Sequence, residues 1–479
     1  MGKVENILYI IICLLICILP FAGMTVAATS ATTENRELAG FPEFWENDSW
    51  NQEYLAELGA YFEDHFAFRK VFVMADSVIQ SRAFGVSNMD TVITGSDGWL
   101  YYASTLKDYL GERTLSEKGI WNAGNNLSLI QKKVEENGAE FLLTVAPNKN
   151  SLYGKHMPYY YRRKISQEKN MTYLKKELVK REIPYADLFA VFEGEKETLY
   201  LKRDSHWNRK GAILAYDAML DYFKLAHETY ETVENIRTRD EYGDLNQMIY
   251  PLPFAPEWNY TYQKEYTYQY VTDTASVEDA WIETENPAGT GRLLMFRDSF
   301  GNTLLPLMAD TFEKAYFSKG TPYNLEQYLE RYHPEYVIME KVERNVDDFA
   351  VDPPIMTGTE VMPAENVEAV ETAATLEVKE SEYDVSCLEI RGILDESFLP
   401  ETRVYIRITK DGQAKEYEAF TVSDETSDYG YVLYMKKEQF PAGTVQVDVL
   451  TENAKGIKCV KTAVFDAGQL PEMQTAKPR

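Results

Sequence analysis

Cysteine, histidine and positive charge are all scarce in this chain of 479 residues. It has four cysteines and five histidines, and 49 lysines and arginines stand against 76 aspartates and glutamates, a net charge of −27. Such a surface repels nucleic-acid phosphates and anionic lipid headgroups. The charge therefore argues against a nucleic-acid partner and against electrostatic docking to a membrane. Neutral glycans and positively charged partner proteins remain compatible with it.

The scarcity of cysteine and histidine also limits metal chemistry. Cys13 and Cys17 lie in an apolar N-terminal run, while Cys387 and Cys459 lie near the C-terminus, where they could pair in an oxidising compartment. Neither spacing is that of a metal site, and no HExxH motif is present. Asp204 and His206, helped by His156 or His65, are the best candidate ligands, but no spacing supports them. We therefore expect no metal and no cofactor.

Only one apolar run approaches the length of a membrane span. Residues 7–24 follow Lys3, include Pro20 and Gly23, and precede the small residues Val26-Ala27-Ala28. This order is typical of an export signal, so residues 1–28 are predicted to be a signal peptide, and Pro20 and Gly23 favour its cleavage. An uncleaved N-terminal anchor is the alternative. In either case the rest of the chain is expected to be extracytoplasmic, secreted or tethered to the outer face of the cytoplasmic membrane.

Composition divides the remaining chain into five segments. Residues 29–40 are small and polar and indicate a tether, and residues 471–479 form a tail. Residues 351–375 contain no aromatic residue, lysine or arginine, and predict a disordered acidic linker. This linker separates a large domain over residues 41–350 from a small one over residues 376–470.

The large domain alternates helical and strand patterns. Helices are expected at residues 115–137, 171–181, 209–225, 302–312 and 325–332, and strands at residues 141–145, 183–189, 198–201, 293–296 and 336–339. Such alternation predicts an α/β fold with a mostly parallel sheet and helices on both faces. Ligands of such sheets bind beyond the carboxyl ends of the strands.

The small domain has a different pattern. Val404, Ile406 and Ile408 alternate with polar residues, and Asp411-Gly412 suits a hairpin turn. Short alternating strands with turn signals predict an all-β sandwich.

Two motifs carry groups suited to acyl transfer. Asp204-Ser205-His206-Trp207 follows the expected strand at residues 198–201, and Asp298-Ser299-Phe300 follows the one at residues 293–296. A serine needs a base to become nucleophilic, and a histidine base needs a carboxylate to fix its tautomer. Ser299, His206 and Asp204 supply these roles, with backbone N–H groups near Ser299 for the oxyanion. Alternatively, the aspartates of both motifs cap the helices that follow.

A resemblance to a known family strengthens the first interpretation. The pieces that carry it are Phe62-Glu63-Asp64-His65-Phe66-Ala67-Phe68-Arg69, Gly95-Ser96-Asp97-Gly98-Trp99-Leu100-Tyr101-Tyr102, Ala146-Pro147-Asn148-Lys149, Asp204-Ser205-His206-Trp207 with Gly211-Ala212, and Asp298-Ser299-Phe300. In this order they resemble the AlgX/AlgJ, or DHHW-type, group of SGNH hydrolase-like proteins, in which Asp and His precede Ser. The resemblance implies an SGNH-like, flavodoxin-like fold.

The resemblance also implies a function. Members of the group O-acetylate exported polysaccharides through an acetyl-serine, with acetyl groups passed outward by a membrane-bound acyltransferase. AlgX carries a C-terminal carbohydrate-binding β-sandwich, which matches this chain in outline. A polysaccharide is thus the expected acceptor. A carbohydrate esterase with the same triad, a non-catalytic glycan-binding or assembly protein, and an adhesive or structural surface protein are the alternatives.

Two positions depart from the family pattern, and several others are candidates for binding. Arg297 stands where the group has Gly, so its guanidinium could bind an anionic sugar or face away, and Ser205 replaces the first His of DHHW.

Trp207 is expected to pack beneath the catalytic loop, and Asn148 could donate to the oxyanion. Tyr262 and Tyr266 belong to a tyrosine-rich extended segment at residues 250–270 that could stack on sugar rings, or form a packed hairpin.

Overall fold

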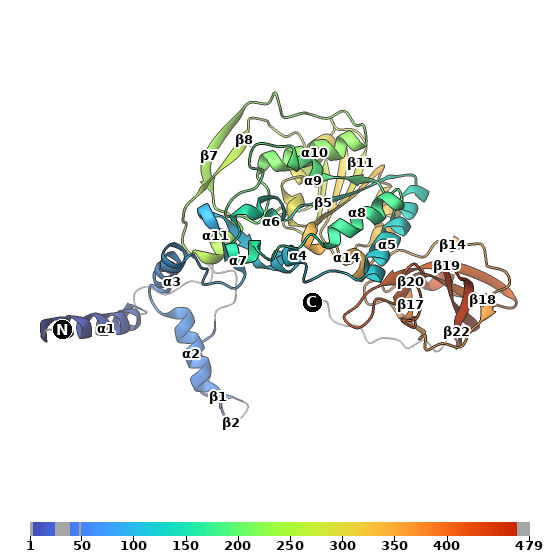
Figure 1. Ribbon diagram of the computed structural model, residues 1–479, viewed down its shortest axis with the longest axis horizontal. Helices are drawn as coiled ribbons and strands as arrows, with labels where there is room; N and C mark the ends of the chain where they lie inside the picture. The colour runs from blue at the N-terminus through green and yellow to red at the C-terminus, as the bar shows by residue number, and fades with distance from the viewer. Residues whose placement is uncertain (1–2, 24–38, 47–48, 467–479) are drawn as a thin grey trace.

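The computed structural model describes residues 3–23, 39–46 and 49–466. Helix α1 (Lys3–Gly23) stands apart from the body of the molecule, with apolar side chains such as Ile7, Leu8 and Ile10 exposed (Figure 1). None of the helices in the described part of the chain combines the length and apolarity of a membrane span. The expected cleavage region, most of the tether and the C-terminal tail lie outside the described residues.

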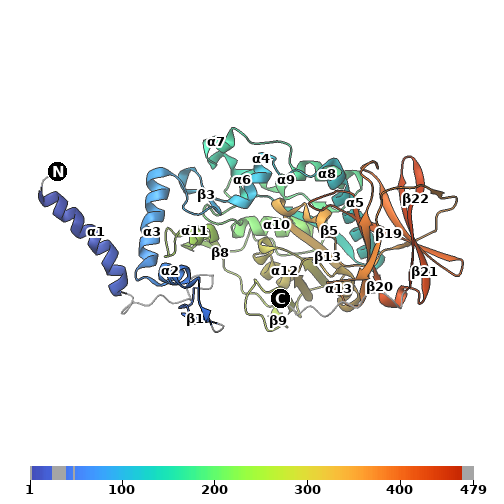
Figure 2. The ribbon, with the colours of Figure 1, turned by 90° about the horizontal axis from the view of Figure 1, so that it is seen from below.

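An N-terminal arm leads into the large domain. It consists of the short hairpin β1 (Trp45–Glu46) and β2 (Ser49–Trp50), followed by α2 (Tyr54–His65) and α3 (Arg69–Ile79). These elements lie to one side of the main body in both ribbon views (Figures 1 and 2). The arm therefore does not contribute to the central sheet.

The central sheet has seven strands in the order β6-β5-β13-β11-β12-β10-β9. The first five run parallel: β6 (Tyr185–Ala186), β5 (Glu140–Ala146), β13 (Tyr336–Val342), β11 (Arg292–Phe296) and β12 (Lys314–Ser318). The antiparallel strands β10 (Trp281–Glu285) and β9 (Gln269–Tyr270) complete one edge. The predicted mostly parallel sheet is confirmed.

Two hydrophobic cores cover the two faces of this sheet. On one face, Leu293 and Met295 pack with α9 (Leu188–Glu193), α10 (Arg209–Tyr222) and α12 (Leu305–Thr311). On the other, Leu294 and Phe296 pack with α5 (Glu117–Glu136), α8 (Asn170–Lys180), α13 (Leu325–Tyr332) and α14 (Asp348–Val351). Both cores draw on strand β11 because successive side chains of a strand point to opposite faces.

Smaller elements surround the sheet. They are β3 (Val92–Thr94), β4 (Leu100–Tyr102), α4 (Leu106–Leu110), α6 (Lys149–Tyr153), α7 (Tyr159–Arg162), β7 (Asn235–Glu241), α11 (Asp244–Ile249) and β8 (Glu257–Tyr262). Strands β7 and β8 form an antiparallel hairpin outside the central sheet. The tyrosine-rich segment thus contains one strand of a hairpin and the edge strand β9.

The expected strand at residues 198–201 is wrong. This segment makes a single bridge, between Tyr200 and Trp207, and joins no sheet. The Tyr153 hydroxyl accepts the N–H of Leu199, and the Leu199 carbonyl accepts the N–H of Asn208. Because these local partners occupy the backbone, the apolar segment folds as a buried loop. Likewise, the expected strand at residues 183–189 ends at Ala186, and α9 begins at Leu188.

The C-terminal domain is all-β, as predicted. Its strands are β16 (Glu377–Glu380), β17 (Cys387–Ile393), β18 (Arg403–Lys410), β19 (Gln413–Val422), β20 (Gly430–Lys436), β21 (Thr444–Asn453) and β22 (Gly456–Asp466). The two layers are joined through β19, whose first part pairs with β18 and whose last part pairs with β20. The domain is therefore one curled sheet closed over a single core. Cys387 and Cys459 are free thiols.

Residues 351–375 differ from the disordered linker expected. The pairs β14 (Glu360–Val361) with β19 and β15 (Glu368–Ala369) with β22 tie this segment to the C-terminal sheet. Backbone pairing needs no aromatic or basic side chain, so composition does not reveal it.

The two domains are joined by buried polar contacts. Asn126 on α5 donates a 2.9 Å hydrogen bond to the carbonyl of Thr421 and accepts one from the N–H of Thr421. The Lys118 ammonium donates to the carbonyl of Thr402 at 3.1 Å. A buried polar group that lost such a partner would cost free energy, so these contacts hold the domains in register.

Candidate active site

Ser299 lies on the turn that follows β11, at the carboxyl edge of the sheet. This turn is the short 3-10 helix η6 (Ser299–Asn302), and Asp298 is its N-cap. The Asp298 carboxylate accepts the N–H of Phe300 and the N–H of Val342, both at 2.8 Å. Asp298 therefore caps η6, as the alternative interpretation held, and also fastens the turn to the end of β13.

His206 lies on the loop between α9 and α10 and not at a strand end. The buried Lys149, at the start of α6, donates hydrogen bonds to the carbonyls of Leu201, Lys202 and Asp204. One ammonium group thus fixes the loop that precedes His206. This contact gives Lys149 of the Pro-x-Lys segment a positioning role that the sequence did not reveal.

The structure brings the three predicted triad side chains into one hydrogen-bonded chain. Nε2 of His206 lies 2.8 Å from Oγ of Ser299, and Nδ1 of His206 lies 2.7 Å from Oδ1 of Asp204. With the Nδ1 proton donated to Asp204, Nε2 is left to accept the hydroxyl proton of Ser299. This is the arrangement that activates a serine nucleophile.

The charges within this chain support that proton arrangement. Burial opposes ionisation of Asp204, but the hydrogen bond and charge of His206 outweigh it and lower the pKa of Asp204 to about 2. Burial alone would lower the pKa of His206, yet the hydrogen bond and charge of Asp204, followed by the charges of Asp244 and Asp298, raise it. The carboxylate is thus ionised at neutral pH, and the imidazolium that forms on proton transfer is stabilised.

A second carboxylate, Asp244, supports the catalytic loop. It accepts the N–H of Ser205 at 2.7 Å and the Ser205 hydroxyl, and its own N–H donates to Oδ2 of Asp204 at 2.9 Å. Its carboxylate lies 3.7 Å from Nδ1 of His206. Ser205, where the DHHW pattern has His, thus links the loop to Asp244.

Glycine at position 243 makes this close approach possible. A Cβ at Gly243 would lie 2.3 Å from the carbonyl oxygen of Arg203 and 2.7 Å from the N atom of Asp204. Asp244 was not predicted from the sequence because it lies 40 residues from Asp204 in the chain. The Gly243-Asp244 pair at the start of α11 was the available signal.

Trp207 lies beneath the catalytic loop, as expected. Its indole is 1% exposed, meets the ring of Phe300 edge-on at 5.0 Å, and donates through Nε1 to Oγ1 of Thr303 at 2.6 Å. Phe300 also contacts the His206 ring at 4.8 Å. Trp207 therefore joins the histidine loop to the serine turn and cannot stack on a substrate.

Replacing Trp207 by phenylalanine is expected to keep the packed ring but remove the hydrogen bond to Thr303. The free energy of unfolding should fall by about 1 kcal/mol, and turnover should fall with little change in KM. Chemical denaturation and ester-hydrolysis kinetics measure the two effects. A matched control is Trp281→Phe, which removes an indole hydrogen bond to Glu283 in the antiparallel part of the sheet. Equal losses of turnover in both variants would contradict the linking role of Trp207.

Arg297 and Asn148 are buried rather than open to a ligand. The Arg297 guanidinium donates to Oδ1 of Asn302 and to the carbonyl of Val277, so it supports the serine turn from inside the fold. Asn148 donates its side-chain N–H to Asp108 at 3.0 Å. In the described part of the chain neither side chain is hydrogen-bonded to Ser299 or His206. Arg297 therefore faces away from a ligand, as one of its two interpretations held, and the Asn148 amide is bonded inside the fold.

The backbone of the serine turn leaves one N–H for an oxyanion. The N–H of Phe300 is bonded to the Asp298 carboxylate, and that of Gly301 to the Asp298 carbonyl. The N–H of Ser299 has no hydrogen-bond partner among the described residues. It is therefore the donor of this turn that is free to meet a developing negative charge.

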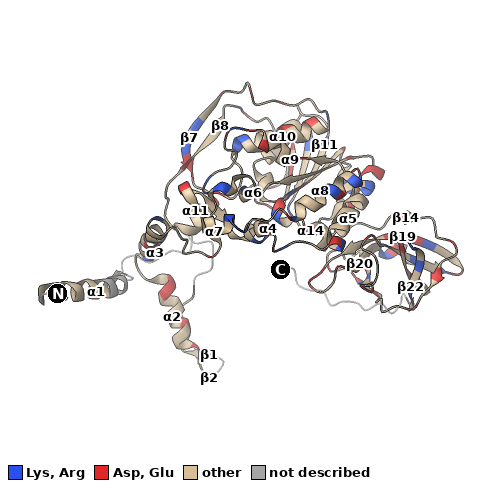
Figure 3. Cartoon of the chain, viewed as in Figure 1, with Lys and Arg blue, Asp and Glu red and all other residues tan. Residues whose placement is uncertain are grey.

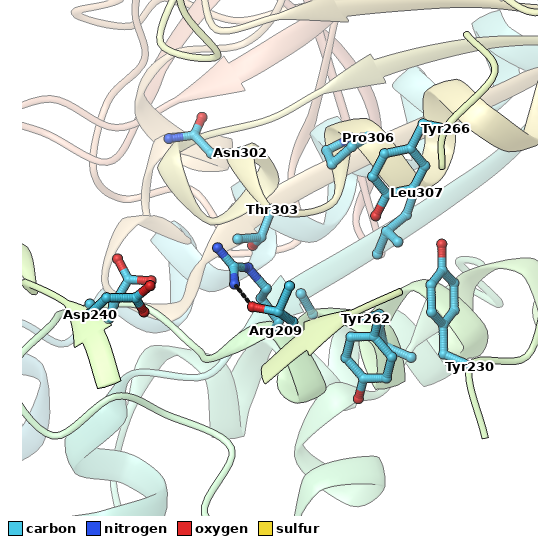
Figure 4. Close-up of a pocket in the computed structure, with 13 residues that line it drawn as sticks. Arg209, Tyr230, Asp240, Tyr262, Tyr266, Asn302, Thr303, Pro306 and Leu307 are labelled. Atoms are coloured by element: carbon cyan, nitrogen blue, oxygen red, sulfur yellow. Dashed lines mark hydrogen bonds between the residues drawn. The ribbon is translucent and has the colours of Figure 1, made fainter. Parts of the chain in front are cut away.

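Tyr262 and Tyr266 line a pocket of about 590 Å³ beside the serine turn. Its wall includes Asn302 and Thr303, whereas Ser299 and His206 are not lining residues. Figure 4 shows Tyr230, Tyr262 and Tyr266 grouped at one end of this pocket, with Thr303 above Arg209. Arg209 donates to Oγ1 of Thr261 at 3.1 Å, which fixes β8 against the end of the catalytic loop.

The predicted metal candidates do not come together. His65 stacks on Tyr61, and His156 stacks on Trp99 beside Asp97. Within the described residues, donor atoms of Asp204, His206 and Asp244 do lie within 4.8 Å of one another. The hydrogen bonds among these three groups and Ser205 already use those atoms.

Comparison with a family model also indicates an SGNH hydrolase-like domain. Residues 92–291 match the family model of an SGNH hydrolase-like domain, acetyltransferase AlgX. The resemblance seen in the motifs is confirmed. The match includes Asp204 and His206 and ends before Ser299, and it indicates an acyltransferase or an esterase. No curated protein matches the chain.

Several solved structures are similar at low identity. PatB1 of Bacillus cereus, solved with a sulfonyl adduct, shares 16% identity at a TM-score of 0.43, over 54% of this chain and 96% of that one. The O-acetyltransferase domain of Pseudomonas putida AlgJ shares 17% identity at a TM-score of 0.36, over 53% of this chain and 92% of that one. Pseudomonas aeruginosa AlgX shares 13% identity at a TM-score of 0.35, over 80% of this chain and 92% of that one.

Proposed function

We propose that this protein is an extracytoplasmic O-acetyltransferase that transfers acetyl groups to an exported or cell-surface polysaccharide through an acetyl-serine intermediate. The observation that carries the proposal is the hydrogen-bonded chain from Ser299 through His206 to Asp204. The family model, whose description names an acetyltransferase, supports the choice of acyl group.

The first half-reaction uses the triad directly. Oγ of Ser299 attacks the carbonyl carbon of the acetyl donor while Nε2 of His206 takes the hydroxyl proton. The N–H of Ser299 donates to the oxyanion, and Asp204 stabilises the imidazolium. The tetrahedral intermediate then expels the donor's leaving group, which takes the proton from His206 and leaves an acetyl ester on Ser299.

The second half-reaction needs an acceptor. Nε2 of His206 removes a proton from a sugar hydroxyl, whose oxygen attacks the acetyl-serine and releases Ser299 with its proton restored. With water as the acceptor, the same residues would make a carbohydrate esterase. The tyrosine-lined pocket beside η6 supports transfer to a sugar, because aromatic rings offer sugar rings an apolar face with a polar edge. The complete triad weighs against a purely glycan-binding protein.

The acetyl donor is proposed to reach Ser299 from a membrane-bound acyltransferase. The apolar segment at residues 7–24 supports an extracytoplasmic location, as a cleaved signal or as an anchor. The C-terminal sheet is proposed to bind carbohydrate by analogy with AlgX.

Replacing Tyr266 by alanine tests the acceptor pocket. The KM for a polysaccharide acceptor should rise about three- to tenfold, while hydrolysis of a small acetyl ester stays unchanged. Mass spectrometry of the acetylated glycan measures the KM for the acceptor, and acetate release measures hydrolysis of the small ester. Tyr159→Ala is a matched control, because Tyr159 is 65% exposed on α7. If acetate is released at one rate with or without any glycan, the esterase alternative holds instead.

A further inference from the structure

We propose that the β7–β8 hairpin carries a second binding site, for an anionic saccharide, apart from the tyrosine-lined pocket beside Ser299. The site is formed by Arg237, Arg239, Trp258 and Tyr260. The proposal rests on the proposed function only in taking saccharides as the class of ligand.

The register of the hairpin places these four side chains on one face. Arg237 pairs with Tyr260 and Arg239 pairs with Trp258. Directly opposed residues of an antiparallel pair point the same way, as do residues i and i+2. The Arg237 guanidinium lies 5.2 Å from the centre of the Tyr260 ring. The result is a ribbon surface with two aromatic rings beside two guanidinium groups.

This face borders a pocket of about 730 Å³. Lys196, Lys202 and Arg203 also line it, so five cations stand against three carboxylates: Asp97, Glu197 and Glu257. The chain as a whole carries a net charge of −27, so a pocket with more cations than carboxylates has the opposite sign of charge to the average surface. Figure 3 shows the blue bands of basic residues along β7.

The cations lack carboxylate partners. In the part of the chain that the structure describes, Lys196, Lys202, Arg237 and Arg239 form no ion pair. Two of the three carboxylates already have other partners. Glu257 accepts the backbone N–H groups of Lys202 and Arg203. Glu197 accepts hydrogen bonds from the Lys210 ammonium and the Tyr260 hydroxyl.

The exposure of these groups suits a ligand rather than the core. Trp258 is 53% exposed, and Arg237 and Arg239 are exposed. Guanidinium groups recognise carboxylate and phosphate through paired hydrogen bonds, and an exposed indole stacks on the apolar face of a sugar ring. Together these groups match a saccharide that bears carboxylate or phosphate groups.

The position of the site links it to the catalytic loop without including the triad. Tyr200, Leu201 and Asn208, which flank Asp204 and His206 in the chain, line the same pocket. The tyrosine-lined pocket shares none of these residues. A saccharide held on the hairpin would therefore leave Ser299 free to react.

Binding of defined oligosaccharides to the full chain tests the proposal. Isothermal titration would compare an oligouronate, a polyol-phosphate oligomer and a neutral glucan, with wild type, Arg237→Gln and Trp258→Ala. Either anionic ligand should bind wild type more tightly than the glucan, and should lose at least about tenfold in affinity in Arg237→Gln. Raising the salt concentration should weaken this binding, because exposed charges are screened. Which anionic ligand binds more tightly distinguishes carboxylate from phosphate recognition.

Arg331→Gln is the matched control, because Arg331 is exposed on α13 and lies over the ring of Tyr332 at 5.1 Å. It should bind the anionic ligand as wild type does. Unchanged affinity in Arg237→Gln, or equal affinity for the neutral glucan, would overturn the proposal. Hydrolysis of a small acetyl ester, measured on the same samples, reports on the triad alone, so the two proposals fail separately.

Discussion

Replacing Ser299 by alanine is expected to reduce hydrolysis of an activated acetyl ester by at least about 10³-fold, because it removes the nucleophile. The hydroxyl that would be lost lies 2.8 Å from Nε2 of His206. The free energy of unfolding should change by no more than about 1 kcal/mol, since one hydrogen bond at a half-buried site is removed. Steady-state kinetics and thermal denaturation measure the two quantities.

The neighbouring serine of the catalytic loop is the matched control. The Ser205 hydroxyl donates to Asp244 and lies 3.2 Å from Nδ1 of His206, on the far side of the imidazole from Ser299. Ser205→Ala should therefore retain turnover within about tenfold of wild type, because it removes a positioning contact and not the nucleophile. A Ser299→Ala enzyme as active as Ser205→Ala would show that the chemistry takes place elsewhere.

Replacing Asp204 by asparagine is expected to lower the maximal rate by about 10³- to 10⁴-fold. Asparagine can donate to Nδ1 and favour the tautomer whose Nε2 carries a proton and cannot accept one from Ser299. The carboxylate that the variant lacks is also the main group that raises the pKa of His206. The remaining activity should therefore have an altered pH dependence as well as a lower maximum.

The direction of the pH change follows from the pKa of His206. Catalysis needs neutral imidazole, so wild-type activity is lost as the pH falls through the raised pKa of His206. Without the Asp204 charge that pKa falls, and the acid limb of the kcat/KM profile should move to lower pH. Asp217→Asn is the control, because Asp217 lies 3.3 Å from His227 in another Asp-His pair. An acid limb that stays in place in Asp204→Asn would contradict the role given to Asp204.

The sequence was sufficient to predict the sheet and the meeting of Ser299, His206 and Asp204. Uninterrupted apolar runs such as residues 293–296 are typical of strands that are covered on both faces in a parallel sheet, and the polar motif that follows Phe296 then lies at the carboxyl edge of the sheet. Ser299, His206 and Asp204 were found because each belongs to a short motif of its own. The loop that carries His206 has no strand of its own, and it is held beside the turn of Ser299 by Lys149 and by the packing of Trp207 on Phe300.

Contacts between distant segments could not be predicted in the same way. Asp244 and Lys149 act on the catalytic loop through hydrogen bonds that span 39 to 55 residues. The local sequence around each residue does not reveal a partner so far along the chain. The segment at residues 198–201 has the composition of a strand, but side chains and loops supply the partners that a strand would have provided. Arg297 was open to two interpretations until its buried partners were known.

The measurement that tests the central claim most directly is intact-mass spectrometry of the protein after brief reaction with an activated acetyl donor, followed by peptide mapping. The account predicts a single added acetyl group on Ser299, absent from Ser299→Ala and reduced in His206→Ala. The acetyl group should be lost when a polysaccharide acceptor is added. A folded protein that gains no acetyl group, or carries it on another residue, would contradict the account.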